Sequence, residues 1–414
     1  MKSDFLQKLL NKKDWLFYVF SNGFNRLVFF VATFWFVTKL GAEQFGMLSV
    51  ALAFFITGQS SFLSIQSLVA VKFHNSKLPI QIVNSVGVRF FTLFALGNLL
   101  LLCVVAALDY KSGRSHLFFL VYPNLLLSNI VSLVIAHLYA RGSIKVVGHV
   151  LFASSIWFLL LILFIQNISI YLVITFYYLY TLFQLLWLRR KLSWVFQGYR
   201  LTGWKLQAIR KYVTKYYVPL LLSMVAVPVI IWLVNYWISR QMGYKEAGFV
   251  VLMLQVQNMI NFLPQIINTL FFRELVSSDI GLALRTRMKN NLLVIISLAG
   301  FPSIVLILLA EAILIRLDNS YITFVTEFRL FIVAFFFATI GNVAGNFLNA
   351  KLDFWEGTYI NIRWAIVFVS LFFILMTIFN NLLAVSLCFL LSYVLHLIFI
   401  IFSLQNNRKA FGLS

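Results

Sequence analysis

The sequence predicts an all-α polytopic membrane protein with about 12 transmembrane helices in two six-helix lobes. Of its 414 residues, 62% are hydrophobic and 11% are charged, a balance that soluble domains do not have. Apolar runs of 18 or more residues recur along the chain, and each is long enough to cross a bilayer as a helix. The ten-residue alternation of a membrane β-barrel is absent, so helices are expected.

An internal repeat divides these runs into two sets. Leu40–Gly46 ends one apolar run and opens the next, and Met242–Gly248 does the same later in the chain. Gly41 and Gly243 are 202 residues apart, as are Gly46 and Gly248. A membrane protein of two equivalent halves usually moves one half against the other around a site between them. Transport is therefore the first hypothesis.

The expected spans follow the apolar runs in order. In the first half they are 15–38, 46–70, 82–108, 116–138, 147–166 and 168–188. In the second half they are 216–239, 246–272, 291–315, 325–349, 357–379 and 381–404. The predicted organisation is a cytoplasmic interfacial segment (1–14), an N-terminal lobe (15–188), a basic cytoplasmic linker (189–215), a C-terminal lobe (216–404) and a cytoplasmic tail (405–414). Residues 1–14 mix apolar side chains with lysines, which favours an amphipathic surface helix that anchors or gates.

The distribution of positive charge predicts the topology. One set of alternate connecting segments holds 23 lysines and arginines, and the opposite set holds only 6. By the positive-inside rule both termini are cytoplasmic. The net charge of +21 then reflects this topology and attraction to anionic membrane lipids. No nucleic-acid partner is expected, because no basic soluble domain is present. Cys103 and Cys388 lie in spans of different halves, so we expect no disulfide.

Four arginines lie within predicted membrane spans, where a charged side chain costs free energy. Arg26 lies about halfway along the first span, and an arginine at mid-membrane costs roughly 2.5–3.5 kcal/mol on insertion scales. It either snorkels and donates to backbone carbonyls or forms an anion site. Arg89, Arg329 and Arg363 lie nearer to span ends, where each alone could snorkel. Together the four suggest a positively charged cavity, and a guanidinium binds phosphate oxygens bidentately.

Amides and hydroxyls cluster in the second and eighth spans. Asn258, Asn261, Gln265 and Asn268 have the spacing of one polar stripe on a helix. Gln59 and Gln66 fall on Asn261 and Asn268 at the repeat offset. The stripe either lines a cavity shared by the two halves or forms hydrogen bonds between helices.

Three further features concern packing and gating. In the tenth span, Gly341 and Gly345 form a GxxxG pattern beside three asparagines, which favours helix packing over a polar lining. Pro219 and Pro228 predict a kinked seventh span that supplies a hinge. Glu311 is expected to pair with an arginine near the outer surface, or alternatively to couple protons.

Signals for catalysis are poor. The five histidines are scattered, and neither a metal-binding spacing nor a P-loop pattern is present. No metal and no cofactor are expected.

The stretch from Thr38 to Ser49, with its LGAEQFGMLS core, resembles the "LGxxxFGxxS" turn between the first two helices of polysaccharide exporters. Pro219–Ser223, followed by Gly243 and Gly248, is similar to the start of their second half. The most similar group is the Wzx-type O-antigen flippases, whose superfamily also holds multidrug-and-toxin extruders and the lipid II flippase.

The resemblance implies two lobes that form a V around a central cationic cavity in the bacterial inner membrane. It implies an undecaprenyl-pyrophosphate-linked oligosaccharide substrate, moved from the cytoplasmic to the periplasmic leaflet by alternating access. A glycan polymerase and a chain-length regulator are the partners that it suggests. The membrane potential or a proton or sodium gradient would drive the cycle. Arg26 matches the family's mid-membrane arginine, and Arg273 the charged position after its eighth helix.

The leading hypothesis is therefore a flippase for a lipid-linked oligosaccharide. Its pyrophosphate would be held by Arg26 with help from Arg89, Arg273 and Arg363. The polar candidates for substrate contact are Asn25, Gln59, Asn258, Asn261 and Asn268, and those for gating or coupling are Pro219, Pro228, Glu311 and Arg329. A cation-coupled multidrug extruder is the first alternative, disfavoured by the lack of an acid in the first span. A membrane glycosyltransferase of the O-antigen polymerase type is the second, and the short outer connections disfavour it.

Overall fold

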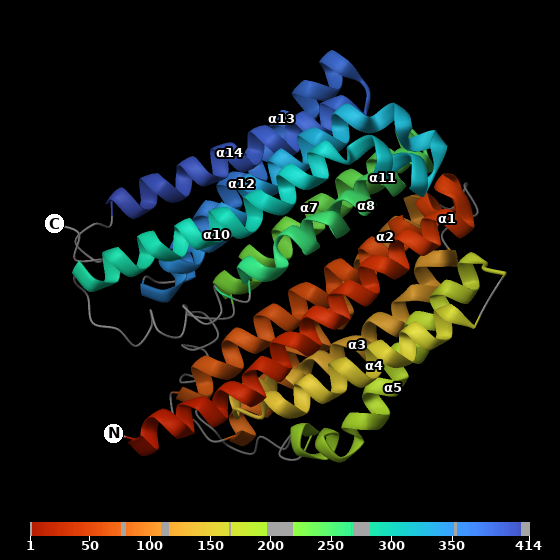
Figure 1. The fold of residues 1–414 in the computed structure, drawn as a ribbon. Helices are drawn as coiled ribbons and strands as arrows, with labels where there is room; N and C mark the ends of the chain where they lie inside the picture. Colours follow the sequence, from red (N-terminus) through yellow and green to blue (C-terminus); the bar gives the residue numbers. More distant parts are fainter. Residues whose placement is uncertain are drawn as a thin grey trace. The chain divides into compact units, whose positions relative to one another are not determined.

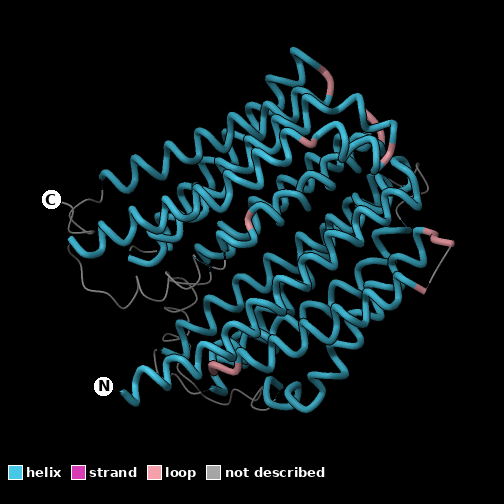
Figure 2. The backbone as a smooth tube through the Cα atoms, viewed as in Figure 1, coloured by secondary structure: helices cyan, strands magenta, loops and turns pink. Residues whose placement is uncertain are grey.

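The computed structural model describes residues 2–75, 80–108, 116–164, 167–196, 218–265, 267, 282–351 and 354–406, and these residues are almost entirely helical (Figure 2). Among them, nine helices are long and apolar enough to cross a membrane. The other three predicted spans lie in a long N-terminal helix and in a helix of 17 residues. The predicted fold class is confirmed: the chain is an all-α, multi-pass membrane protein.

The chain divides into two compact units. The first contains Met1–Ala32 and Met47–Tyr217. Its helices, labelled in Figure 1, are most of α1 (Lys2–Asn75), α2 (Ile80–Leu108), α3 (His116–Ala140), α4 (Ile144–Leu163) and α5 (Ile170–Phe196). Within this unit α3 packs against α2, α4 and α5, and α4 packs against α5.

The second unit contains Thr33–Gly46 and Val218–Ser414. Its elements after α1 are α7 (Val218–Gln241), α8 (Tyr244–Ile260), α10 (Leu282–Leu308), α11 (Ala310–Leu317), the 3₁₀ helix η3 (Asn319–Phe324), α12 (Val325–Lys351), α13 (Phe354–Phe379) and α14 (Leu382–Asn406). Helix α14 packs against α12 and α13, and α7 packs against α8 and α13 (Figure 1). The predicted lobe boundary at 15–188 stays a prediction, and the contacts place Thr33–Gly46 with the second unit.

Helix α1 carries the first two predicted spans. The predicted turn at 40–46 is reduced to one non-helical residue, Gly41, with φ of 75° and ψ of 165°. This backbone conformation is left-handed in φ, where a side chain is strained and glycine is not. At the amino end, α1 begins at Lys2, so the predicted interfacial helix is continuous with the first span.

The GxxxG pattern packs helices, as predicted. A Cβ atom built on Gly341 would lie 3.7 Å from both His396 and Ile400 of α14, and one on Gly345 would lie 3.8 Å from Ile400. Ile400 also belongs to a buried apolar cluster with Leu348 of α12. Small residues on α12 thus let α14 approach closely.

The two prolines predicted to kink the seventh span lie at different positions in α7. Pro228 lies inside α7. Pro219 is the second residue of α7, and its carbonyl oxygen accepts a hydrogen bond from the Thr358 hydroxyl at 2.8 Å. Residues 197–217, which precede α7, lie outside the described part of the chain. The kink and the hinge role therefore stay predictions for both Pro219 and Pro228.

Candidate functional site

Arg26 lies in the part of α1 that belongs to the first unit, and its side chain is partly buried. One turn earlier, the Asn22 amide donates to the Tyr18 hydroxyl at 3.3 Å. No acidic residue occurs between Asp14 and Glu43. Along this stretch of α1 the charge of Arg26 is therefore accompanied by neutral polar groups, an environment that suits an anion.

A buried polar network fixes the residue next to Arg26. The Asn25 carboxamide oxygen accepts two hydrogen bonds, one from the Ser155 hydroxyl of α4 at 2.7 Å and one from the Tyr180 hydroxyl of α5 at 2.8 Å. Ser155 is fully buried and Tyr180 is 7% exposed. Three helices thus meet at Asn25, one residue from the candidate anion ligand.

The network extends along α4 and α5. The Gln184 amide of α5 donates to the Ser154 hydroxyl of α4 at 3.2 Å, and both side chains are buried. The rings of Phe29 and Phe158 lie 5.0 and 5.5 Å from that of Tyr180, between centroids. This apolar wall lowers the local dielectric, which strengthens each hydrogen bond and makes an unpaired group costly.

The sequence predicts Asn25 as a substrate contact but does not predict its hydrogen-bond partners. The strongly apolar fourth to sixth spans contain few polar residues, among them Ser154, Ser155 and Gln184. The free-energy cost of a polar side chain in such a span is the only feature of the sequence that could have indicated them. Their partners lie 30 to 130 residues away, a relationship that local spacing does not contain.

The other predicted arginines are placed as follows. Arg89 of α2 and Arg363 of α13 are exposed, the first in the first unit and the second in the second. Arg273 and Asn268 lie outside the described residues. Gln59 is partly exposed on α1. A shared cationic cavity that would unite the arginines stays a prediction.

The predicted stripe on the eighth span is described only in part, because Asn268 lies outside the described residues. Helix α8 ends at Ile260 with Asn261 as its C-cap, and helical hydrogen bonds continue from the Asn261 N–H to the Gln257 oxygen and from the Gln265 N–H to the Asn261 oxygen. Asn261 is buried and accepts a hydrogen bond from the Thr339 hydroxyl of α12, whereas Asn258 and Gln265 are exposed. Of the two alternatives, a cavity lining or a hydrogen bond between helices, Asn261 shows the second, because its carboxamide oxygen accepts from a hydroxyl on α12.

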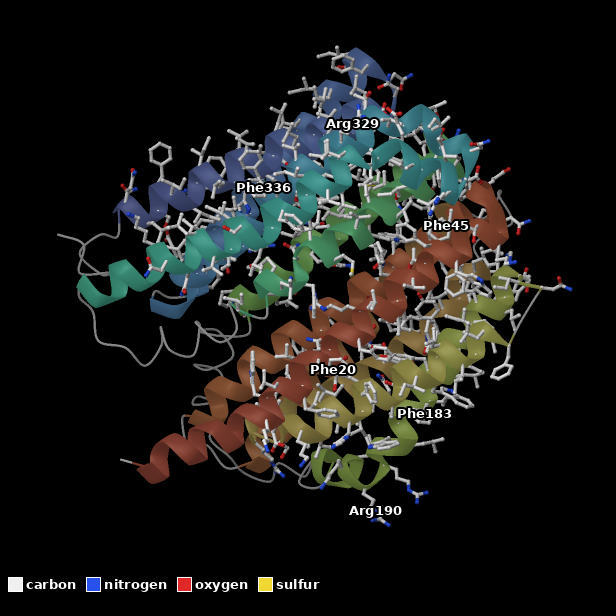
Figure 3. All side chains as sticks on the ribbon, viewed as in Figure 1. Phe20, Phe45, Phe183, Arg190, Arg329 and Phe336 are labelled. Carbon is white, nitrogen blue, oxygen red and sulfur yellow. The ribbon has the colours of Figure 1, made fainter. Side chains whose placement is uncertain are left out.

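Glu311 pairs with an arginine, as expected. Its carboxylate lies 3.2 Å from the Arg329 guanidinium, and both side chains are exposed (Figure 3 labels Arg329). Exposed pairs of this kind contribute little to stability. A role of either residue in gating or coupling stays a prediction.

The described residues contain no group of three or more histidine, cysteine or acidic side chains that could hold a metal ion. What they do contain is Arg26 together with the Tyr18 hydroxyl and the Asn22 amide on the same helix. Such a set can bind and orient an anionic or hydroxyl-rich molecule without covalent chemistry.

Comparison of the sequence with family models and with curated proteins finds no match. The fold, in contrast, is similar to those of several solved transporters. One is the inward-facing conformation of a multidrug resistance MATE family transporter of the MOP superfamily, with a TM-score of 0.69 at 10% identity, covering 93% of this chain and 96% of the other.

Two further solved transporters have a similar fold. A complex of the MATE multidrug transporter DinF-BH with a bound ligand has a TM-score of 0.66 at 13% identity, covering 97% of this chain and 96% of the other. A MOP superfamily transporter from Pyrococcus furiosus Vc1, described as having a binding pocket of reversed polarity, has a TM-score of 0.63 at 11% identity, covering 96% and 97%. Over nearly its whole length, this chain has the fold of the MATE transporters of the MOP superfamily.

Proposed function

We propose that the protein is a transporter that flips an anionic, lipid-linked oligosaccharide across the membrane by alternating access. The single observation that carries this proposal is Arg26, placed within a spanning helix and flanked by the hydrogen-bonded Asn25. A permanently charged guanidinium in a spanning helix marks a substrate path more often than a packing site. The pyrophosphate of an undecaprenyl-linked O-antigen-type unit is the substrate that we assign to it.

The distribution of acids supports an anionic substrate. Between residues 15 and 188 the sequence contains only two acidic residues, Glu43 and Asp109, and both fall between predicted spans. A carrier of cations requires a carboxylate or another anion within its spanning helices to offset the charge of the substrate. The predicted spans of the first half of this chain contain cationic and neutral polar groups instead.

The sugar part and the driving force complete the proposal. Hydroxyl-rich sugars match the amides and hydroxyls near Arg26, and the prenyl tail stays in lipid. A potential that is negative inside favours outward movement of the anionic head group by about 2.3 kcal/mol per charge per 100 mV. The inner membrane, cytoplasmic termini and a polymerase partner belong to the same proposal.

A multidrug extruder is the second candidate, and the fold favours it. One similar structure is that of a MATE multidrug transporter with a bound ligand. The two candidates predict opposite roles for Arg26, because a guanidinium attracts a pyrophosphate and repels a cation.

Reconstitution separates them. Proteoliposomes carrying a fluorescent undecaprenyl-pyrophosphate disaccharide in both leaflets are treated with a membrane-impermeant quencher, and the rate of flipping is read from the slow loss of protected fluorescence. A charge-assisted hydrogen bond contributes about 1.5–3 kcal/mol, so Arg26→Ala is expected to slow flipping by roughly 10- to 100-fold. Arg26→Lys is expected to flip the probe at a rate between those of wild type and Arg26→Ala, since lysine keeps the positive charge and lacks the bidentate guanidinium.

The matched control is Arg190→Ala, since Arg190 is exposed at the end of α5 and points away from the helices of its unit (Figure 3). It is expected to flip at the wild-type rate. Equal rates for wild type and Arg26→Ala would overturn the proposal. Accumulation of a fluorescent cationic rhodamine dye by inverted vesicles, undiminished in Arg26→Ala, would establish the multidrug alternative.

A further inference from the structure

The two turns that revealed the internal repeat contact each other within the second unit. Gly248 lies so close to Gly46 that a Cβ atom built on Gly248 would lie 2.8 Å from the Gly46 Cα. A Cβ atom built on Gly46 would overlap the Tyr244 carbonyl oxygen. No residue other than glycine fits at position 46 unless the backbones separate.

A polar contact lies beside this crossing. The Ala42 N–H donates to the Asp318 carboxylate at 3.0 Å, across 276 residues of sequence. The other carboxylate oxygen of Asp318 accepts the Ser320 N–H at 2.8 Å. We call Ala42, Gly46, Tyr244, Gly248 and Asp318 the clasp. It holds the middle of α1 (Thr33–Gly46) against the rest of the second unit.

The positions of the two glycines in the repeat have a geometric consequence. Gly46 and Gly248 are equivalent residues at the 202-residue offset, and each contacts the other. Equivalent turns of the internal repeat therefore meet at one place. When repeated halves rock against each other, contacts between their turns at one end of the helices separate.

We propose that the clasp is a latch that opens and closes during the transport cycle, so that Thr33–Gly46 leaves and rejoins the rest of the second unit. This inference rests on the protein being a transporter, and not on the identity of its substrate. The latch would lie at the end of the helices that the charge distribution predicts to be periplasmic.

The contacts suit a releasable joint. At the crossing, backbone packs on backbone, since a Cβ atom built on Gly46 would meet the Tyr244 carbonyl and one built on Gly248 would meet the Gly46 Cα. The Asp318 carboxylate is partly exposed, and water can replace the Ala42 N–H as its donor. In the closed state, Phe45, which is 2% exposed, packs its ring 3.3 Å from a Cβ atom built on Gly248 (Figure 3 labels Phe45). Burial of this ring favours closure.

Glycines also free the chain on both sides of the contact. Gly41 has φ of 75° and Gly243 has φ of 135°, values that side chains rarely adopt. The first unit ends at Ala32 and resumes at Met47. The latched segment is therefore joined at both ends to the first unit, which can pull it away.

The first experiment requires no substrate. With Cys103→Ser and Cys388→Ala as background, nitroxides are attached at Glu43→Cys and Asn319→Cys, exposed neighbours of Ala42 and Asp318. Dipolar broadening of the electron spin resonance spectrum reports the closed latch in lipid nanodiscs. Wild type is expected to give a mixture of broadened and unbroadened spectra, and Gly46→Ala to shift it toward the unbroadened form. Gly97→Ala is the matched control, because a Cβ atom there has no neighbour within 4 Å.

The second experiment asks whether release is required. In the same cysteine-free background, Ala42→Cys and Asp318→Cys are bridged by a short bis-methanethiosulfonate, which forms a disulfide with each thiol and releases methanesulfinate. Flipping of the fluorescent undecaprenyl-pyrophosphate disaccharide is measured before bridging, after bridging and after reduction of the disulfides. We expect at least a tenfold loss on bridging and recovery on reduction. Bridging Asp14→Cys to Lys145→Cys, an ion pair at 3.5 Å within the first unit, is expected to leave the rate unchanged.

A fully broadened wild-type spectrum that Gly46→Ala does not change, or undiminished flipping in the bridged protein, would overturn the latch. If wild type moves no undecaprenyl probe at all, the proposed substrate fails and the spin-label result alone decides the latch. If Gly46→Ala does not fold, Gly248→Ala takes its place, since its Cβ atom would meet the Gly46 Cα at 2.8 Å.

Discussion

The carboxamide oxygen of Asn25 on α1 accepts a hydrogen bond from the Tyr180 hydroxyl on α5, 155 residues further along the chain. Ser155 of α4 donates to the same oxygen. Because successive side chains on an α-helix are turned by about 100°, fixing Asn25 also fixes the direction in which Arg26 leaves α1. The network therefore connects the packing of three helices with the placement of the candidate anion ligand.

Removing the two donors is expected to destabilise the protein in a graded way. Tyr180→Phe or Ser155→Ala removes one hydrogen bond, which costs about 1 kcal/mol, whereas the double variant leaves a buried acceptor unpaired and costs about 1–3 kcal/mol in addition. Chemical unfolding in detergent micelles measures these values. Tyr171→Phe is the control, because its hydrogen bond with His116 is exposed. Equal stability of the double variant and wild type would contradict the network.

A second buried pair is expected to behave as a coupled unit. Thr339 on α12 donates to Asn261 after α8. Asn261→Leu or Thr339→Val alone leaves a buried polar partner unpaired and is expected to cost about 1–3 kcal/mol. The double variant is expected to cost less than the sum, because both polar groups are then gone. A double-mutant cycle measured by chemical unfolding tests this, and strictly additive costs would disprove the pairing.

Much of the architecture was predictable from the sequence, because the bilayer imposes a simple length rule on apolar runs. Each of the twelve predicted spans contains residues of a described helix, and the GxxxG pattern correctly indicated packing of α12. The repeat indicated the turns at Gly41 and Gly243, although not that they contact each other. That contact depends on tertiary placement, which an offset in sequence does not encode.

The candidate site was less predictable, for reasons that particular residues make clear. The cost of Arg26 in a membrane singled it out, but the partners of Asn25 come from α4 and α5 and have no local signature. Along the eighth span, Asn261 is buried against α12 whereas Asn258 and Gln265 are exposed, a difference that spacing alone does not contain.

The Glu311–Arg329 pair is expected to contribute little and to depend on salt. Both side chains are exposed at 3.2 Å separation, and exposed pairs typically couple by about 0.2–1 kcal/mol. A double-mutant cycle with Glu311→Gln and Arg329→Gln, measured at low and high salt, reports this energy. The coupling is expected to shrink as salt screens the charges. A coupling of several kcal/mol that salt does not weaken would show that the pair is shielded from water.

The clasp is expected to make stability depend on acid pH through Asp318. Partial burial raises the pKa of this carboxyl, but the Ser320 and Ala42 N–H groups and the nearby charge of Lys245 outweigh it and hold the pKa below its ordinary value of 3.8. A pKa that is lower in the folded state means that the stabilisation is fully present above 3.8 and is lost as the pH falls through the folded value.

Thermal unfolding of wild type and Asp318→Asn between mildly acidic and strongly acidic pH isolates this contribution. Asp318→Asn is expected to unfold at a lower temperature near neutral pH, because a neutral amide accepts the Ala42 and Ser320 N–H groups less strongly than a carboxylate. The difference between the two proteins is expected to shrink as the pH falls below 3.8, since protonation removes the advantage of wild type. Other carboxyls titrate equally in both proteins, so their effects cancel in the difference between the two unfolding temperatures. A difference that stays constant down to the lowest pH would show that the charge of Asp318 does not hold Thr33–Gly46 in place.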